Sequence, residues 1–176
     1  TGVQAQITMP YGIGSFIMSG LYAITVVVGI HHMYTLIDLG QLARYGCTYW
    51  LPLAGAANVA QGGAAFAVAL KTKDTKVKSM ALPSALSACM GITEPAIFGV
   101  NLRCFKPFLG GLAGGACGAW YASIVGLGAT GTGVTGIFGI LLHLHMPLQY
   151  IIMMAISFGV SFAVTWIIWK PEEVKA

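Results

Sequence analysis

The stretch Gly91-Ile92-Thr93-Glu94-Pro95-Ala96-Ile97-Phe98-Gly99-Val100-Asn101 decides the fold, because it sets a carboxylate and a proline inside a long apolar region. Glu94 is the only acidic residue between Asp74 and Glu172, and a carboxylate at membrane depth commonly marks a functional site. Pro95 removes a backbone donor and disfavours helical geometry at Glu94. We therefore predict that a helix breaks at Glu94 beside a wet cavity; the alternative is a Glu-Pro turn in an aqueous loop.

Composition places the chain in a membrane. Of its 176 residues 57% are hydrophobic and only 8% are charged, with a mean hydropathy of +0.80, whereas soluble domains average about 25% charged residues. The net charge of +4 sits in short hydrophilic breaks, which does not indicate nucleic-acid binding. The four cysteines lie apart without metal-ligand spacing, so we expect no metal and no cofactor. The prediction is an all-α integral membrane protein.

Four apolar stretches are long enough to cross about 30 Å of hydrocarbon as helices. They are residues 12–37, 51–70, 107–129 and 147–169. Two further apolar stretches are interrupted: residues 79–102 contain Pro83 and Glu94-Pro95, and residues 130–146 open on Thr-Gly-Thr-Gly-Val-Thr. Interrupted apolar segments at membrane depth point to a transporter's substrate site. We therefore predict about four transmembrane helices plus two re-entrant hairpins.

The positive charges predict the sidedness of these segments. The lysine-rich loop 71–78 is the most hydrophilic part of the chain, and cytoplasmic loops carry an excess of Lys and Arg. Positive residues also follow the first interrupted stretch, at 103–106, and the last span, at Lys170. If all three clusters are cytoplasmic, then residues 79–102 enter and leave on the same side, as a hairpin does. Arg44 is then the one positive residue placed outside.

Two adjacent histidines near the end of the first apolar stretch are candidate ligand-binding residues. His31 and His32 point about 100° apart if they lie on a helix, so only one of them faces a given cavity. We favour His32, which shares a helical face with Thr35. The alternative for each histidine is a hydrogen bond between helices.

Uncharged polar residues complete the candidate site. Asn58 and Gln61 are three residues apart and share one helical face, and Asn101 ends the opening stretch. Amide side chains carry donors and acceptors, which suits sugar hydroxyls, although Asn58 and Gln61 also fit as contacts between helices. Thr93 precedes the carboxylate, and Thr132 lies in the threonine- and glycine-rich run, which forms either a cavity lining or a flexible turn.

Several motifs resemble one family. The pattern GITEPAIFGVNLR…KPF at 91–108 resembles the signature of the membrane-embedded IIC permeases of the bacterial phosphoenolpyruvate-dependent sugar phosphotransferase system, glucose–glucoside type. GIHH at 29–32 resembles the family's paired histidines. Three other stretches resemble the sucrose-specific branch most closely: NVAQGGAA at 58–65, KTKD at 71–74 and LPSALSA at 82–88.

The resemblance covers about the C-terminal half of the family's permease domain. Residues 1–170 would be that part, and residues 171–176 a cytoplasmic tail. We interpret the chain as a piece of a longer protein, because nothing in it resembles the N-terminal helices or the phosphocysteine motif of the IIB domain.

The resemblance also implies a mechanism in the bacterial inner (plasma) membrane. Such permeases are similar to elevator-type carriers that form homodimers through their N-terminal half. Their sugar is phosphorylated by the phosphorylated IIB domain, so the permease acts as one component of a sugar phosphotransferase. Glu94 matches the sugar-binding glutamate, as a general base or a positioning group, and His31 and His32 match the histidines.

Alternatives remain for the function. Sucrose is the first expected sugar, followed by trehalose and β-glucosides, whose permeases share the GITEP motif. A second reading is an ion-coupled secondary transporter with Glu94 as a proton or Na⁺ site. A third is a membrane scaffold without a substrate.

Overall fold

The computed structural model describes residues 12–171, and helices make up most of that range. Within these residues, the one β-type backbone pairing is an isolated antiparallel bridge between Thr48 and Ala129. In chain order the elements are α2 (Ile13–Val28), η2 (Ile30–Met33), α3 (Tyr34–Tyr45), α4 (Trp50–Lys71), α5 (Thr75–Cys89), α6 (Glu94–Ala96), η3 (Ile97–Asn101), α7 (Leu102–Cys104), α8 (Lys106–Ile124), η4 (Gly136–His143) and α9 (Pro147–Ile168). The predicted all-α class is confirmed.

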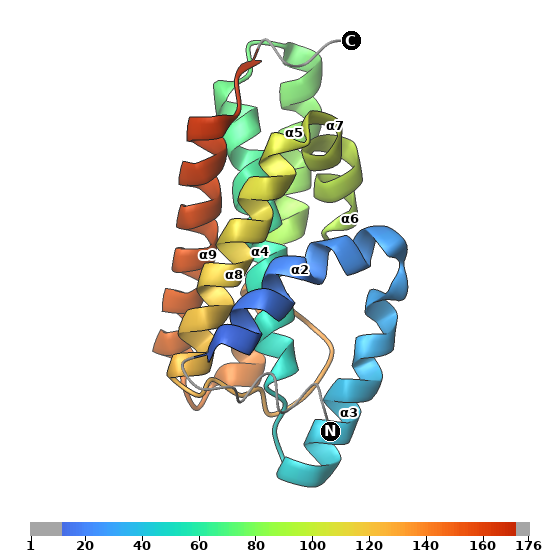
Figure 1. Ribbon diagram of the computed structural model, residues 1–176, viewed down its shortest axis with the longest axis vertical. Helices are drawn as coiled ribbons and strands as arrows, with labels where there is room; N and C mark the ends of the chain where they lie inside the picture. The colour runs from blue at the N-terminus through green and yellow to red at the C-terminus, as the bar shows by residue number, and fades with distance from the viewer. Residues whose placement is uncertain (1–11, 172–176) are drawn as a thin grey trace.

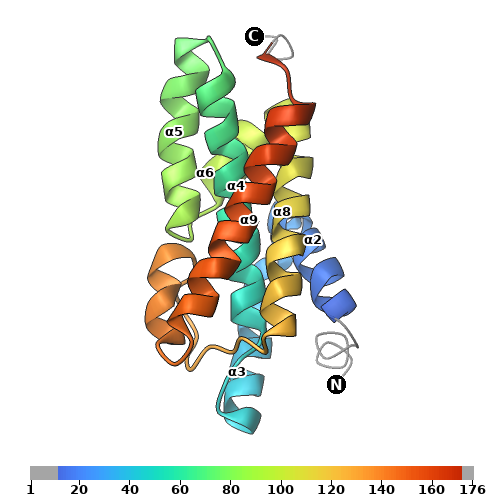
Figure 2. The same cartoon turned by 90° about the vertical axis from the view of Figure 1, so that its left-hand side faces the viewer.

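Helix α4 is the centre of the molecule, and α2, α5, α8 and α9 pack around it (Figures 1 and 2). Nearly all of its residues are buried, because small side chains on every face let the neighbours come close. A Cβ atom at Gly63 would lie 2.7 Å from the carbonyl oxygen of Phe158 in α9, and one at Gly62 would lie 3.0 Å from that of Ala85 in α5. The predicted helix at 51–70 is thus confirmed as the core of the bundle.

A glycine stripe on α8 meets a hydroxyl stripe on α9. Gly110, Gly114 and Gly118 recur every four residues, and a Cβ atom on each would overlap Thr165, Ser161 or Ser157, respectively. These hydroxyl residues are fully buried, and the Ser161 hydroxyl donates to the carbonyl of Ala60 at 2.5 Å. Small residues at a fixed spacing therefore set the distance between α8 and α9, as is typical of helices packed in a membrane.

The first hairpin, residues 75–104, has two helical arms joined by a turn. Its first arm, α5, is capped by Asp74, whose side chain accepts a hydrogen bond from the amide of Lys76 at 2.8 Å. The chain turns at Gly91, where φ is +102°, and α6 then begins at Glu94. The break is where the sequence predicts it, immediately before the carboxylate, and Pro95 is accommodated in the first turn of the new helix.

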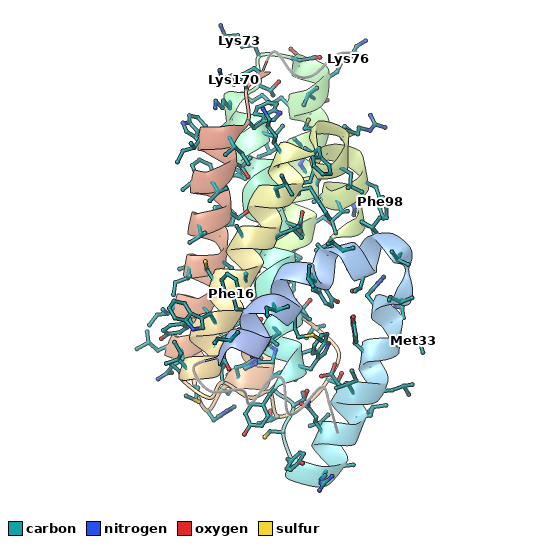
Figure 3. The ribbon with its side chains drawn as sticks, viewed as in Figure 1. Phe16, Met33, Lys73, Lys76, Phe98 and Lys170 are labelled. Carbon is teal, nitrogen blue, oxygen red and sulfur yellow. The ribbon has the colours of Figure 1, made fainter. Side chains whose placement is uncertain are left out.

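Both arms of the first hairpin reach the same end of the molecule. Figure 1 shows α7, the last turn of the second arm, near the end from which α5 starts. Figure 3 shows Lys73, Lys76 and Lys170 together at that end. The arrangement therefore agrees with a hairpin that enters and leaves on one side.

The second hairpin, residues 130–146, is shorter and is not α-helical. An irregular segment leads into η4, a 3₁₀ helix, and α9 starts directly afterwards at Pro147. The Tyr150 hydroxyl of α9 donates to the carbonyl of Gly136 at 2.7 Å. The His143 ring stacks on the same tyrosine with 4.2 Å between ring centroids. Side chains of α9 therefore hold this element in place.

The predicted uninterrupted helix over residues 12–37 is wrong. Helix α2 ends at Gly29, which has a φ of +82°, and the chain beyond it turns by 119°. Residues 38–45 continue helix α3. No proline or charge marks the bend, so hydropathy alone does not show it. Glycine allows it, because a left-handed backbone is strained for other residues.

Two described helices, α4 and α9, are long and apolar enough to cross a membrane, and the bent pair α2–α3 makes a third if it counts as one span. The predicted stretch 107–129 forms α8, which lies between α2 and α9 in contact with both. The helical character of the predicted stretches is confirmed, whereas the number of crossings remains a prediction.

The two tryptophans at the end of α9 differ in burial. Trp166 is 41% exposed, but Trp169 is completely buried against residues of α4 and α5. Lys71, at the end of α4, donates to the carbonyls of both tryptophans. The C-terminal end of α9 is thus capped by a cation from the neighbouring helix, an arrangement that stabilises a helix terminus.

Candidate functional site

Glu94 lies opposite His31, where two breaks in the helical structure meet. The carboxylate begins the second arm of the first hairpin, and the histidine lies in η2, at the bend between α2 and α3 (Figure 1). His31 Nε2 is 3.7 Å from Glu94 Oε1. The carboxylate side chain is 49% exposed and the imidazole 16% exposed. The pair therefore presents one acceptor and one imidazole to an open space, an arrangement that suits a ligand with hydroxyl groups.

The structure places His31, rather than the favoured His32, beside the carboxylate. The two rings lie 4.0 Å apart, and His32 is exposed. The two side chains would point about 100° apart only if a regular α-helix ran through both residues. The pair instead occupies a 3₁₀ turn that follows the bend at Gly29, so the geometry of an α-helix does not apply there.

Among the residues that the structure describes, no lysine or arginine lies within 4.0 Å of the Glu94 carboxylate. Its basic neighbour is His31, at 3.7 Å. In the same part of the chain no group of three His, Cys, Asp or Glu side chains is arranged to hold a metal ion. The carboxylate is therefore free to accept hydrogen bonds from a ligand.

Gln61 and Asn101 bind each other. The Asn101 amide donates to Gln61 Oε1 at 2.7 Å and to the Gln61 carbonyl at 3.0 Å. Both residues are fully buried, and Gly111 in α8 gives the glutamine side chain its space, since a Cβ atom there would overlap it. The pair fastens η3, the π-helical turn after Glu94, to α4. This geometry matches the alternative of a contact between helices.

Asn58 and Thr93 lie near the tips of the two hairpins. The Asn58 amide in α4 donates to the Thr135 hydroxyl at 2.8 Å. Thr93 is buried at the turn of the first hairpin, and its carbonyl accepts from the amide of Ile97 at 2.9 Å. Both residues thus have hydrogen-bond partners within the protein. Thr93 immediately precedes Glu94, and Asn58 bonds to the second hairpin, which touches the turn before Glu94.

Thr132 lies beside a separate polar cluster, which is centred on Asp38 of α3. Its hydroxyl lies 3.5 Å from Asp38 Oδ2, and the Thr48 hydroxyl donates to Asp38 Oδ1 at 2.5 Å. Gln41 Oε1 accepts from the amide of Tyr49 at 2.7 Å. Asp38 is only 5% exposed. The cluster ties α3 to the segment that leads into the second hairpin.

Sequence reasoning missed two residues that organise the site, Thr135 and Tyr150, and the buried Asp38 of the separate cluster. Thr135 is the last residue of the threonine- and glycine-rich run 130–135, which the sequence predicted as either a cavity lining or a flexible turn. Its neighbour Gly136 is buried and has a φ of +63°. The glycines in this run were the available signal, since a left-handed glycine marks a tight turn. Tyr150 gave no signal, because its partner is a backbone carbonyl 14 residues away.

The chain was compared with known proteins. Residues 1–115 match the family described as "Phosphotransferase system, EIIC". The chain is 45% identical over 159 residues to the PTS system sucrose-specific EIIBC component of Salmonella typhimurium, covering 89% of this chain and 35% of that protein. It is 39% identical over 185 residues to the protein of the same name from Bacillus subtilis, covering 98% of this chain and 39% of that protein.

A third relative has another sugar in its name. The chain is 38% identical over 156 residues to the PTS system trehalose-specific EIIBC component of Bacillus subtilis, covering 88% of this chain and 33% of that protein. No solved structure matches the chain. The chain spans about a third of the length of the curated relatives it matches. On the family match and these identities, the chain belongs to the EIIC family of the phosphotransferase system, a family of bacterial membrane proteins.

Proposed function

We propose that the chain is the sugar-binding part of a phosphotransferase-system permease of the bacterial inner membrane. In the complete protein it imports a disaccharide that the IIB domain phosphorylates. The observation that carries this proposal is the Glu94–His31 pair at the break of the first hairpin, 3.7 Å apart and open to a ligand. In a chain of the EIIC family, a carboxylate in an apolar helical bundle with no lysine or arginine partner among the described residues fits a sugar site better than a structural role.

The chemistry follows from the carboxylate. A sugar hydroxyl donates a hydrogen bond to Glu94, and a bond to a charged acceptor is about twice as strong as a neutral one. If that hydroxyl is the one to be phosphorylated, Glu94 accepts its proton as a general base while the oxygen attacks the phosphoryl group carried by the IIB phosphocysteine, whose S–P bond breaks and whose thiolate leaves. His31 contributes a second polar contact and, when protonated, partly compensates the charge of Glu94.

The two hairpins are the elements that carry the sugar across the membrane in this proposal. Both are interrupted elements whose tips touch each other beside α4, and interrupted elements of this kind form the midplane sites of many transporters. We propose that they move together as an elevator-type transport domain. The lysine-rich end, which carries Lys73, Lys76 and Lys170 (Figure 3), faces the cytoplasm and the phosphorylated IIB domain. Homodimerisation through the N-terminal half of the complete permease completes the proposal.

Sucrose is the proposed substrate. The support is that relatives named as sucrose-specific match 89% and 98% of this chain. A trehalose-specific relative matches 88% of it at lower identity, which makes trehalose the second candidate. Disaccharides that share a glucosyl unit offer nearly the same hydroxyls to Glu94 and His31, so discrimination depends on the second sugar ring.

The test is energy coupling in the complete protein. Membrane vesicles that contain the full-length permease receive labelled sucrose together with a phosphoryl-donor system or, in a parallel sample, an imposed proton gradient. We expect sucrose phosphate as the product, with phosphate on the glucosyl 6-hydroxyl, and no dependence on an uncoupler. Accumulation of unmodified sugar that collapses with an uncoupler would instead identify an ion-coupled transporter.

Labelled trehalose and a β-glucoside in the same assay test the sugar. Phosphorylation of either one at least ten times faster than that of sucrose would overturn the choice of sucrose and leave the permease function intact.

A further inference from the structure

The tips of the two hairpins meet through their backbones. A Cβ atom at Gly91 would lie 2.7 Å from the Thr135 hydroxyl and 3.1 Å from the Thr135 carbonyl oxygen. A Cβ atom at Gly136 would overlap the carbonyl of Cys89 and lie 2.8 Å from the amide nitrogen of Gly91. Both glycines have a positive φ. The contact therefore depends on a glycine in each tip, and a side chain on either glycine would separate the hairpins.

Thr135 links this contact to the rigid core. Its hydroxyl accepts the Asn58 amide hydrogen at 2.8 Å, and Asn58 is only 6% exposed within α4, the most buried helix of the bundle. The neighbouring residue, Gly136, is held by the buried Tyr150 hydroxyl of α9 at 2.7 Å. The second tip is thus fixed from two helices, and the first tip rests against it.

The turn that rests on Thr135 carries Glu94. Gly91 is three residues before the carboxylate. On its other side the turn is closed by Ser87, whose hydroxyl donates to the Ile92 carbonyl at 2.9 Å and whose carbonyl accepts from the Ile92 amide at 3.0 Å. The bonds from Ser87 lie within the first hairpin and move with it. The contact with Thr135 is different, because it fixes the turn relative to α4.

We infer that Thr135 is a positioning residue for Glu94. Because Thr135 is bonded to Asn58 and contacts the Gly91 turn, it holds that turn in place relative to α4. It thereby sets where the carboxylate meets the sugar. The inference rests on the proposed sugar site at Glu94. It also changes the expected role of Asn58, which then acts on the sugar through Thr135 rather than by touching it. A small displacement of a group that contacts substrate lowers turnover strongly, because catalysis depends on its alignment.

The test uses the full-length permease with Thr135→Val, which keeps the shape and removes the acceptor, and Thr135→Ser, which keeps the hydroxyl. Thr130→Val is the matched control, because the exposed Thr130 hydroxyl bonds to the Leu142 carbonyl within its own segment. We expect Thr135→Val to lower kcat/KM for sugar phosphorylation about tenfold, and the serine and control variants to stay within about twofold of wild type. Equal kinetics of Thr135→Val and wild type would overturn the inference.

A double-mutant cycle separates indirect from direct action of Asn58. Asn58→Leu breaks the same link from the other side, so the double variant with Thr135→Val should be no worse than either single variant. If Thr135→Val fails to accumulate in the membrane, Asn58→Leu alone still tests the link, because it removes the same hydrogen bond. Losses that multiply would show that Asn58 acts on the sugar independently, and the inference would fail.

Hydrogen exchange gives a readout that needs no sugar. Without ligand, Thr135→Val should raise the exchange of the amides at 89–93 at least fivefold, and Thr130→Val should leave it unchanged. If wild type phosphorylates no sugar, the proposed function fails and the exchange data still decide the positioning role. If wild type is active and exchange at 89–93 is unchanged in Thr135→Val, the positioning role fails and the proposed function stands.

Discussion

The two hairpins of this protein are built in different ways. The first hairpin (residues 75–104) has two helical arms, a side-chain cap at Asp74 and a turn closed by its own residue Ser87. The second hairpin (residues 130–146) has a 3₁₀ helix whose position depends on Tyr150 and Asn58 from other helices. The turn of the first hairpin is closed by a local interaction, whereas the second hairpin is held mainly by side chains of other helices. Re-entrant segments therefore need not share a mode of stabilisation even when their tips touch.

The largest expected effect is in thiol labelling, which reports the side of the membrane from which each hairpin starts. Thr75 begins the first hairpin and His145 ends the second, and both are exposed. With each replaced by cysteine in turn, in a background without other accessible cysteines, a membrane-impermeant thiol reagent should label Thr75→Cys only from the cytoplasm and His145→Cys only from outside. Labelling of both positions from one side would show that residues 79–102 cross the membrane, and the comparison of two hairpins would collapse.

The chemistry should reside in the first hairpin. Glu94→Gln keeps the shape of the side chain and removes both its charge and its basicity. We expect sugar phosphorylation to fall by about two orders of magnitude, as is usual for a positioned acid–base group, with little change in the amount of protein in the membrane. Asp74→Asn is the control, since it changes another acid of the same hairpin to a residue that also caps helices. Full activity of Glu94→Gln would remove the carboxylate from the mechanism.

The second hairpin should be the less tolerant of added volume. A Cβ atom at Gly139 would overlap the Tyr150 hydroxyl, whereas the nearest atom to one at Gly99 in the first hairpin is the Met80 sulfur at 3.7 Å. Overpacking usually costs about 1–3 kcal/mol, so Gly139→Ala should lower the Tm of the purified protein clearly. Gly99→Ala should stay within about 0.5 kcal/mol of wild type. Equal shifts for the two variants would show that both hairpins are equally constrained.

The smallest effect distinguishes the two histidines. The His31–Glu94 separation of 3.7 Å is long for a hydrogen bond, so the contact contributes little until a ligand joins it. We expect His31→Gln to weaken sugar binding about fivefold, equivalent to about 1 kcal/mol for one polar contact. His32→Gln should have less effect, because that ring is exposed. Equilibrium binding of labelled sugar to both variants decides between them, and a larger loss in His32→Gln would contradict the assigned orientation.

The amino-acid sequence by itself determined the membrane class, the helical stretches and the position of the break at Glu94. Those features follow from local physical chemistry: 8% charged residues, long apolar stretches, and a proline that a helix accepts only in its first turn. The sequence also placed Gln61 and Asn101 near the site. Their amides offer both donors and acceptors, so the same residues suited either a sugar or each other.

Only the tertiary structure decided which of these residues are already paired. Asn101 bonds to Gln61, Asn58 bonds to Thr135, and Glu94 is left beside His31. It also decided the bend at Gly29 and the buried state of Asp38. The physical reason is the same in each case. A glycine permits a bend without requiring it, and a hydroxyl or amide takes whichever partner the packing of distant helices brings within about 3 Å, which no local pattern records.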